Sequence, residues 1–231
     1  MTTSGDATFT VTRDQIIKGA LRCINAIATG ETPTAAEISE GSEALNYMVK
    51  AWQAEGIGLW LYDTFALTLV ADQQSYTIGS GGDVNTVRPL DVIECRFHYT
   101  TDGNEIPMNK WSRQEYFDQS LKSSTGVPTQ FYYDPQLSLG VLYIWPTWDT
   151  TPAGSINGTL LTTIEDFDAA NNTSDFPPEW FECLKFNLAL RLAPEYGKEP
   201  SSLVVGLAMQ TKDAAQSWDR EKTGIQFVVG R

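Results

Sequence analysis

The stretch Leu45-Asn-Tyr-Met-Val-Lys-Ala-Trp-Gln-Ala-Glu-Gly56, followed by Phe65-Ala-Leu-Thr-Leu69, contains a change of hydrophobic period that decides the predicted fold. In the first part, Leu45, Met48 and Trp52 recur at the spacing of an amphipathic helix, and Gly56 is a typical helix end. In the second part, apolar residues alternate with small or polar ones, which is typical of a half-buried strand. The chain therefore passes from a helix into a sheet between these two segments.

Two capping boxes indicate where helices begin upstream of this change. Thr12-Arg-Asp-Gln15 and Thr34-Ala-Ala-Glu37 each pair a threonine with a later Gln or Glu, so that the two side chains satisfy backbone N–H groups at a helix start. Apolar residues with helical spacing follow each box, and Gly30 ends the first run. The short loop between the runs contains a proline, and the pair is predicted to form an antiparallel helix hairpin.

Downstream of Leu69 the sequence predicts a mainly antiparallel sheet. Thr101-Asp-Gly-Asn104 is typical of a tight hairpin turn, and a third capping box, Ser112-Arg-Gln-Glu115, predicts a short helix to about Lys122. Turns that contain Gly and Pro separate the apolar runs. The expected strands cover 76–78, 92–99, 105–108, 131–133, 141–145 and 159–164.

Phe176-Pro-Pro178 marks a return to helix, because proline fits a first helical turn, where its missing N–H would be unpaired anyway. An apolar ridge with helical spacing follows, and a last helix is expected over 201–222. The ridge consists of Trp180, Leu184, Leu188 and Leu192.

These elements predict an α+β chain in which helix pairs at both ends build a helical bundle and an antiparallel β-sheet region is inserted between them. The bundle body is expected at 1–60 and 174–223, and the inserted β-rich domain at 61–173. An extended C-terminal arm is expected at 224–231.

The composition argues against several classes of protein. The chain has 231 residues, of which 42% are apolar, so there is ample material for a core. A net charge of −13, with only 16 Lys and Arg residues, argues against binding nucleic acid through its phosphates, although double-stranded DNA can pass an acidic wall without specific binding. No apolar run is long enough to cross a membrane, and the N-terminus lacks the pattern of a secretory signal. The protein is therefore expected to work where it is made, or in a particle assembled there.

The sequence contains no constellation typical of catalysis, and we expect no catalytic residue, cofactor or metal. The single histidine, His98, follows Cys95 at an odd offset on a predicted strand, so the two side chains are expected on opposite faces. A pairing of His98 with Cys23 or Cys183 through the fold is left open. The three cysteines are widely spaced and odd in number, which argues against a disulfide framework or a zinc ribbon.

Two alternatives, a hydrolase and a carbohydrate-binding protein, depend on side chains that the sequence cannot place. A peptidoglycan hydrolase needs two carboxylates across a cleft, and its candidates are Glu37, Glu40, Glu43, Glu165, Asp166 and Asp168. A carbohydrate-binding tail protein needs open aromatic rings, and its candidates are Tyr132, Tyr133, Tyr143, Trp145 and Trp148. Solvated charges and core packing explain the same residues, and we favour that interpretation.

The chain ends in a short apolar tail. It comprises Gly224, Ile225, Gln226, Phe227, Val228, Val229, Gly230 and Arg231. Exposed apolar residues of high β-propensity invite unwanted pairing. The tail is therefore better explained by docking into another subunit, through strand addition or in a groove, than by a frayed end.

Segments spread over nearly the whole chain together resemble one protein family. They are Ile17-Lys-Gly-Ala-Leu-Arg-Cys-Ile24, Gly30-Glu-Thr-Pro-Thr-Ala35, Ala44-Leu-Asn-Tyr-Met-Val-Lys-Ala-Trp-Gln-Ala-Glu-Gly-Ile-Gly-Leu-Trp60, Gln74-Ser-Tyr-Thr-Ile-Gly79, Arg88-Pro-Leu90, Gly126-Val-Pro-Thr-Gln-Phe-Tyr-Tyr133, Leu142-Tyr-Ile-Trp-Pro146, Phe176-Pro-Pro-Glu-Trp180 and Leu188-Ala-Leu-Arg-Leu-Ala-Pro-Glu-Tyr-Gly197. In order and spacing they resemble the head-to-tail adaptor proteins of podophages, the P22 tail accessory factor group within the head-tail connectors.

The resemblance implies a structural virion protein: a homo-oligomeric ring, a dodecamer in such proteins, that is seated beneath the portal protein and carries the tail nozzle or other distal tail proteins. Such a ring lines the DNA passage, is assembled in the host cytoplasm and remains in the tail connector of the virion. The arm at 224–231 is then the portal-binding segment. Asp102, Gly103, Asn104 and Trp148 in the β-rich part become the expected contacts on the tail side. Some members are linked to cell-wall hydrolysis, but no catalytic residue maps onto this chain.

Overall fold

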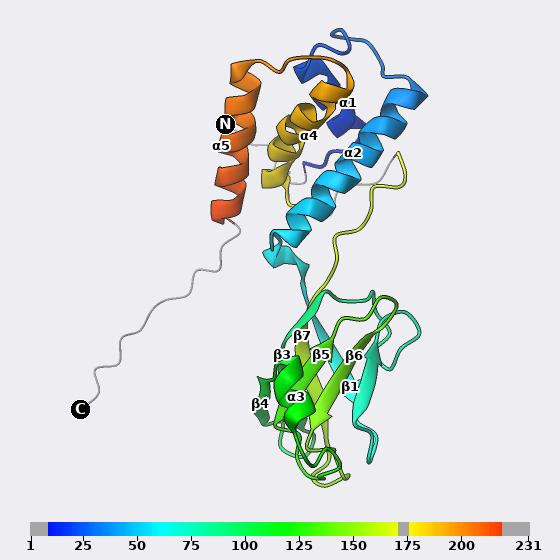
Figure 1. Ribbon diagram of the computed structural model, residues 1–231, viewed down its shortest axis with the longest axis vertical. Coiled ribbons are helices and arrows are strands. Elements are labelled where there is room, and N and C mark those ends of the chain that lie inside the picture. The colour runs from blue at the N-terminus through cyan, green and yellow to red at the C-terminus, as the bar shows by residue number, and fades with distance from the viewer. Residues whose placement is uncertain (1–8, 171–175, 219–231) are drawn as a thin grey trace, which may run out of the picture. The chain divides into compact units, whose positions relative to one another are not determined.

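The computed structural model describes residues 9–170 and 176–218, and these residues form two compact units (Figure 1). The first unit is helical and combines the two ends of the chain, 1–59 and 164–231. The second unit, 60–163, is one continuous stretch that contains all the strands of the described residues. We call them the helical unit and the sheet unit, and each is described by itself.

Four α-helices and a short 3₁₀ turn form the helical unit. Thr34 caps the second helix as the sequence predicts, because its N–H donates to Glu37 Oε2 over 2.7 Å and its Oγ1 accepts from the Glu37 N–H over 3.3 Å. Thr12 likewise donates its N–H to Gln15 Oε1 over 3.0 Å at the start of the first. The elements are α1 (Arg13–Cys23), α2 (Ala35–Ala54), η2 (Pro178–Trp180), α4 (Phe181–Glu195) and α5 (Ser202–Trp218).

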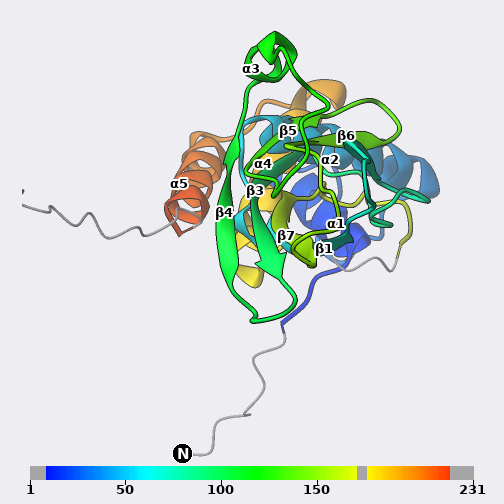
Figure 2. The same cartoon turned by 90° about the horizontal axis from the view of Figure 1, so that it is seen from below.

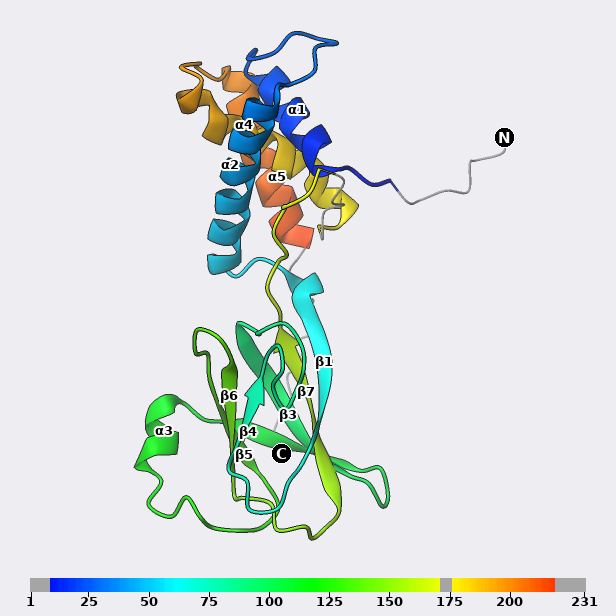
Figure 3. The same cartoon turned by 90° about the vertical axis from the view of Figure 1, so that its right-hand side faces the viewer.

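Helix α4 is the centre of the helical unit, since it packs against α1, α2 and α5 (Figures 1 and 3). The rings of Trp52 on α2 and Trp180 on η2 lie 5.9 Å apart, and both side chains are buried. Helices α1 and α2 approach closely at Gly41, where a Cβ would meet Ile17. The aromatic pair therefore joins α2 to η2, and the glycine contact joins α1 to α2.

Seven strands and a short helix form the sheet unit, which the 3₁₀ turn η1 (Leu59–Leu61) precedes. The strands pair in the order β1-β7-β3-β4-β5-β6-β2. All neighbouring strands are antiparallel except β4 and β5, which are parallel. The elements are β1 (Tyr62–Thr68), β2 (Ser75–Ile78), β3 (Asp91–Tyr99), β4 (Glu105–Lys110), α3 (Arg113–Asp118), β5 (Gln130–Asp134), β6 (Gly140–Trp145) and β7 (Gly154–Leu161).

Glycines make room for aromatic rings inside this curled sheet. A Cβ on Gly158 of β7 would lie 2.5 Å from Cε1 of Phe65, and one on Gly154 would meet the Phe97 ring. Gly140 of β6 has the same relation to Tyr133 of β5. The rings fold over the glycines and fill the interior that the sheet encloses.

The predicted fold, a helical bundle that carries an inserted antiparallel sheet, is wrong. The strands dominate the core, because one continuous cluster of buried residues draws side chains from all seven of them, including Phe97, Phe131 and Ile156. The sheet is also mixed rather than antiparallel. Sequence periodicity finds single elements, but it does not register how much apolar area a curled sheet encloses. The expected arm at 224–231 lies outside the described residues.

The buried hydroxyl of Tyr133 makes the sheet unit sensitive to alkali. Its Oη donates to the Pro89 carbonyl over 2.8 Å, and burial raises the pKa of the phenol to about 12. A phenol whose pKa is raised on folding stabilises the folded state fully below its ordinary pKa of about 10, and that contribution is lost as the pH rises through the folded value. We therefore expect stability to fall between about pH 10 and pH 12.

In urea unfolding followed across this range, Tyr133→Phe is expected to lose about 1 kcal/mol at neutral pH, the net value of one hydrogen bond, and to show a shallower fall in alkali. The exposed Tyr62, changed to Phe, serves as the control. An unchanged slope in Tyr133→Phe would contradict the assignment.

Candidate functional site

The loops at one end of the sheet unit form the candidate site. The chain enters and leaves the unit at the opposite end, where Thr162 donates its N–H to the Leu61 carbonyl over 2.9 Å. We call the three loops at 69–74, 100–104 and 146–153 the distal loops. Thr100 donates its N–H to the Ala153 carbonyl over 3.1 Å, and Asp72 donates its N–H to the Trp148 carbonyl over 2.9 Å. Backbone hydrogen bonds thus join all three.

Asp102, Gly103 and Asn104 form the tip of the β3–β4 hairpin, which projects beyond the neighbouring strands (Figures 2 and 3). Gly103 has a φ of +74°, which favours glycine, and its N–H donates to the Tyr99 carbonyl over 2.9 Å. Asn104 donates its N–H to Asp102 Oδ1 over 3.1 Å and its Nδ2 to Asp102 Oδ2 over 2.6 Å. The tight turn that the sequence predicts is confirmed, and its tip is exposed and internally braced.

Trp148 lies at the same end as this hairpin tip, but in a different environment. Its side chain is half-buried against the sheet core, and Nε1 donates to the Pro152 carbonyl over 2.9 Å. The structure thus brings Trp148 and the hairpin tip to one end of the unit, through the bond between Thr100 and Ala153. Trp148 supports the loop from beneath, while the hairpin tip is exposed to solvent.

Two further features of the distal loops escaped the sequence analysis. Asp72 and Thr150 have φ values of +62° and +81°, a region that residues with a Cβ rarely occupy. Such conformations concentrate where a surface has a role in binding. The carboxylates of Asp72, Asp102 and Asp149 are all exposed here, so the end of the unit is acidic. Positive φ at a non-glycine residue has no reliable sequence signal.

The aromatic residues proposed for carbohydrate binding are engaged with one another. Tyr132 and Tyr143 stack at 5.8 Å, and Tyr116 of α3 lies over both. Trp145 stacks on Trp111 at 5.4 Å, and its Nε1 donates to the Leu121 carbonyl over 2.9 Å. Tyr133 belongs to the sheet core. Packing therefore accounts for these rings, and the aromatic cluster attaches α3 to β5 and β6.

A polar network covers the outer face of β3, β4 and β7, and sequence analysis missed it. Glu94 accepts from Arg96 Nη2 over 2.8 Å and from Thr159 Oγ1 over 3.1 Å, while Glu105 accepts from Asn157 Nδ2 over 2.8 Å. The network borders a shallow hollow of about 460 Å³. The even spacing of Glu94 and Arg96 on β3 is the signal that could have found it. Its charges pair with one another, which is typical of a stabilised solvent face.

His98 and Cys95 form no reactive pair. Cys95 is buried in the core and His98 lies on the opposite face, where Nδ1 is 3.5 Å from Glu105 Oε1, as the odd offset predicts. Burial raises the pKa of the thiol of Cys95, and that of Cys183 to about 12, so neither thiol ionises readily. Within residues 9–170 and 176–218, no group of three or more His, Cys, Asp or Glu side chains could hold a metal ion.

The carboxylates proposed for a hydrolase have local partners in the helical unit. Glu37 caps α2, and the α2 side chains of Glu40 and Glu43 accept from the hydroxyls of Tyr196 and Tyr47 over 3.2 and 2.8 Å. Asp166 forms an ion pair with Lys50 at 2.8 Å. Glu165 and Asp168 are exposed. These carboxylates belong to α2 and to the segment that follows β7.

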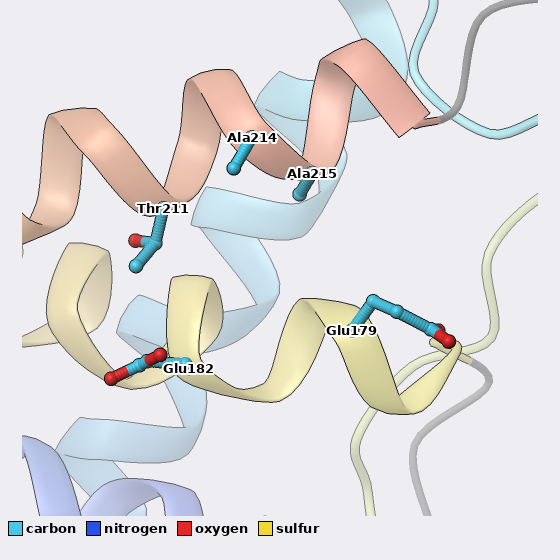
Figure 4. Close-up of a pocket in the computed structure, with 5 residues that line it drawn as sticks. All are labelled: Glu179, Glu182, Thr211, Ala214 and Ala215. Carbon is cyan, nitrogen blue, oxygen red and sulfur yellow. The ribbon is translucent and has the colours of Figure 1, made fainter.

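A hollow of about 270 Å³ between α4 and α5 contains two carboxylates that the sequence analysis did not single out (Figure 4). Glu179 on η2 and Glu182 on α4 point away from each other in this view. The α5 side of the hollow consists of Thr211, Ala214 and Ala215. The two carboxylates therefore do not face a common substrate position, as an acid–base pair would.

The remaining sequence-predicted residues, 224–231 of the arm, lie outside the described part of the chain. No helix within that described part combines the length and the apolar character needed to span a membrane. No family model matches the sequence, and no curated protein is significantly similar to it.

Proposed function

We propose that this chain is a structural virion protein, a head-to-tail adaptor that forms a ring between the portal and the tail nozzle of a short-tailed phage. The sequence resemblance, which spans nearly the full length of the chain, supports this assignment. The acidic character of the chain, with a net charge of −13, suits a wall past which double-stranded DNA slides without specific binding. The bound partners are then the portal protein, the distal tail proteins and further copies of the chain.

The observation that carries the proposal is the exposed apolar face of α5. Leu203 and Met209 are 70% and 63% exposed on this helix, and Gly206 between them has no atom within 4 Å of where its Cβ would be. The two residues are six positions apart, about 120° around the helix, so they flank its solvent-facing side, and large apolar side chains exposed in this way are typical of a surface that another protein covers. The chain continues from α5 into the apolar tail at 224–231. We assign portal binding to the solvent-facing side of α5 and to the sequence of this tail.

The distal loops are the matching candidate for the tail side. The exposed tip of Asp102, Gly103 and Asn104 is held by its own hydrogen bonds, so little conformational entropy is lost when a partner binds it. An acidic tip with few apolar groups fits a polar partner surface that carries Lys or Arg. The two proposed partners thus use different units of the chain.

Loss of the α5 face or of the tail is expected to weaken portal binding strongly. Deletion of 224–231 and the double change Leu203→Ser with Met209→Ser each remove apolar area that would be buried in the complex, at about 1.5–3 kcal/mol for each large side chain. We expect affinity for portal rings to fall at least a hundredfold in either variant. Electron microscopy of the wild type mixed with portal should show a second, coaxial ring.

The control is Leu137→Ser, since Leu137 is 94% exposed but belongs to the sheet unit. It should bind portal as the wild type does. Normal portal binding by both α5-side variants, with their helical content unchanged by circular dichroism, would refute the proposed portal surface.

A further inference from the structure

The solvent-facing side of α1 carries cations that have no carboxylate partner among the described residues. Lys18 and Arg22 lie one helical turn apart, and the stem of Lys185 from α4 crosses α1 at Gly19, 3.1 Å from where a Cβ would be. The Lys185 ammonium lies over the Phe186 ring, 4.2 Å from its centroid, a cation–π contact that leaves its positive charge without a carboxylate. None of these three cations forms an ion pair within the described residues. We call Lys18, Arg22 and Lys185 the basic face.

The solvent-facing side of α2 carries the opposite charge. Glu40 and Glu43 are exposed, and their partners among the described residues are tyrosine hydroxyls. Tyr47, one turn further, is 65% exposed, and its hydroxyl donates to Glu43 Oε1 over 2.8 Å. No cation pairs with either carboxylate in the part of the chain that the structure describes. We call Glu40, Glu43 and Tyr47 the acidic face.

Helix stability explains only part of this arrangement. Arg22 in the last turn of α1 interacts favourably with the helix dipole, as Glu37 does in the first turn of α2. Lys18, Glu40 and Glu43 lie away from those favourable ends. Like charges gathered on one face repel each other, and a partner of opposite charge relieves that repulsion. The basic face therefore lacks negative charges, which the acidic face can supply, and the acidic face lacks positive charges, which the basic face can supply.

We propose that the acidic face of one copy binds the basic face of the next copy, so that the helical units join head to tail. A contact between two different faces is heterologous, and heterologous contacts repeat around a closed ring. Tyr47 adds an aromatic ring that can stack on a guanidinium such as that of Arg22. This inference rests on the proposed ring function and identifies the surfaces through which the ring closes.

Charge reversal on each face tests the contact. Variant one carries Lys18→Glu and Arg22→Glu, and variant two carries Glu40→Lys and Glu43→Lys. Variant one then has two acidic faces and variant two has two basic faces, so neither can bind itself. In an equimolar mixture every junction of an alternating ring is again complementary. Neither variant touches the α5 face or the distal loops.

Sedimentation velocity at low ionic strength should show salt-sensitive self-association of the wild type, because screening weakens exposed charge pairs. Each variant alone should associate about tenfold or more weakly, since exposed pairs contribute up to about 1 kcal/mol each and reversal adds repulsion. The equimolar mixture should return to within about threefold of the wild type, and native mass spectrometry should find both chains in equal number.

Matched controls reverse exposed charges elsewhere on the helical unit. Arg191→Glu with Lys198→Glu, and Glu182→Lys with Asp213→Lys, should associate as the wild type does. The contact is refuted if the wild type remains monomeric in low salt, if the face variants associate as the controls do, or if mixing restores nothing. Because no portal is present, these results are independent of the portal assay. If the wild type forms a salt-sensitive ring that does not bind portal, the proposed function is refuted but this contact between copies is supported.

Discussion

Gly158→Leu is expected to destabilise the sheet unit by about 3 kcal/mol or more, one of the two largest effects that we predict for a single change. Gly158 lies in the middle of β7, where it pairs with Phe65 on β1 and Cys95 on β3. A Cβ here would be 2.5 Å from the Phe65 ring and 2.6 Å from the Glu94 carbonyl oxygen. The ring can be displaced, but the carbonyl belongs to the backbone of a paired strand and cannot move without disturbing the ladder.

Urea unfolding, followed by near-ultraviolet circular dichroism, measures this loss. Adding Phe65→Ala to Gly158→Leu should recover part of the stability, because it removes the ring but leaves the carbonyl contact. The exposed Gly206→Leu on α5 is the control and should leave stability equal or slightly higher, since leucine favours a helix interior. A loss below about 1 kcal/mol in Gly158→Leu would show that the sheet accommodates the side chain.

Trp180→Ala is expected to destabilise the helical unit by about 3–5 kcal/mol. The ring of Trp180 is 1% exposed and lies 5.9 Å from the Trp52 ring and 5.8 Å from the Phe176 ring. Truncation leaves a cavity where η2 leads into α4, the helix against which α1, α2 and α5 pack. The loss should appear in the unfolding transition of the helical signal at far-ultraviolet wavelengths.

Trp111→Ala is the matched control for this change, since the two variants lose the same side chain. Trp111 is half-buried and stacks on Trp145 at 5.4 Å. Its loss should cost less than about 2 kcal/mol and affect the sheet unit. Equal losses in the two tryptophan variants would show that the helical unit does not depend on this aromatic contact.

Local sequence patterns predicted the helix starts correctly for a physical reason. A capping box requires two side chains and one turn of backbone, and nothing distant enters. The contacts of Thr34 with Glu37 and of Ser112 with Glu115 are therefore present as predicted. The tight turn at Asp102, Gly103 and Asn104 was predictable for the same reason, because its bonds lie within the turn.

The strand order and the sheet core could not be read from the sequence in this way. β4 and β5 pair in parallel across the segment that contains α3, and β7 inserts between β1 and β3 from far along the chain. Periodicity carries no record of such distant partners. In the sequence, for example, Gly158 only lowers the propensity of its segment to form a strand. In the structure, its lack of a side chain leaves the space that the Phe65 ring occupies. The prediction that the helices dominate the fold was wrong because the volume that the sheet encloses cannot be inferred from the sequence pattern.

In the candidate site, too, local features could be predicted from the sequence and features that depend on distant contacts could not. The hairpin tip followed from four consecutive residues, but its connection to Trp148 depends on the pairing of Thr100 with Ala153. The exposure of Leu203 and Met209 on α5 also escaped prediction, because their helical spacing is equally compatible with burial. Only packing decides which side of an amphipathic helix is covered.

The placement of β1 and β7 has a mechanical consequence. Both strands run the full length of the sheet unit, from the end where the chain enters and leaves to the distal loops, and they lie side by side in antiparallel register from Tyr62 with Leu161 to Thr68 with Ser155. A pull on the loops at 69–74 and 146–153 therefore travels to the helical unit along two covalent backbones. Because β1 and β7 each carry the tension through their own covalent backbone, the hydrogen bonds between them are not loaded. The strands of the sheet therefore stay paired under tension.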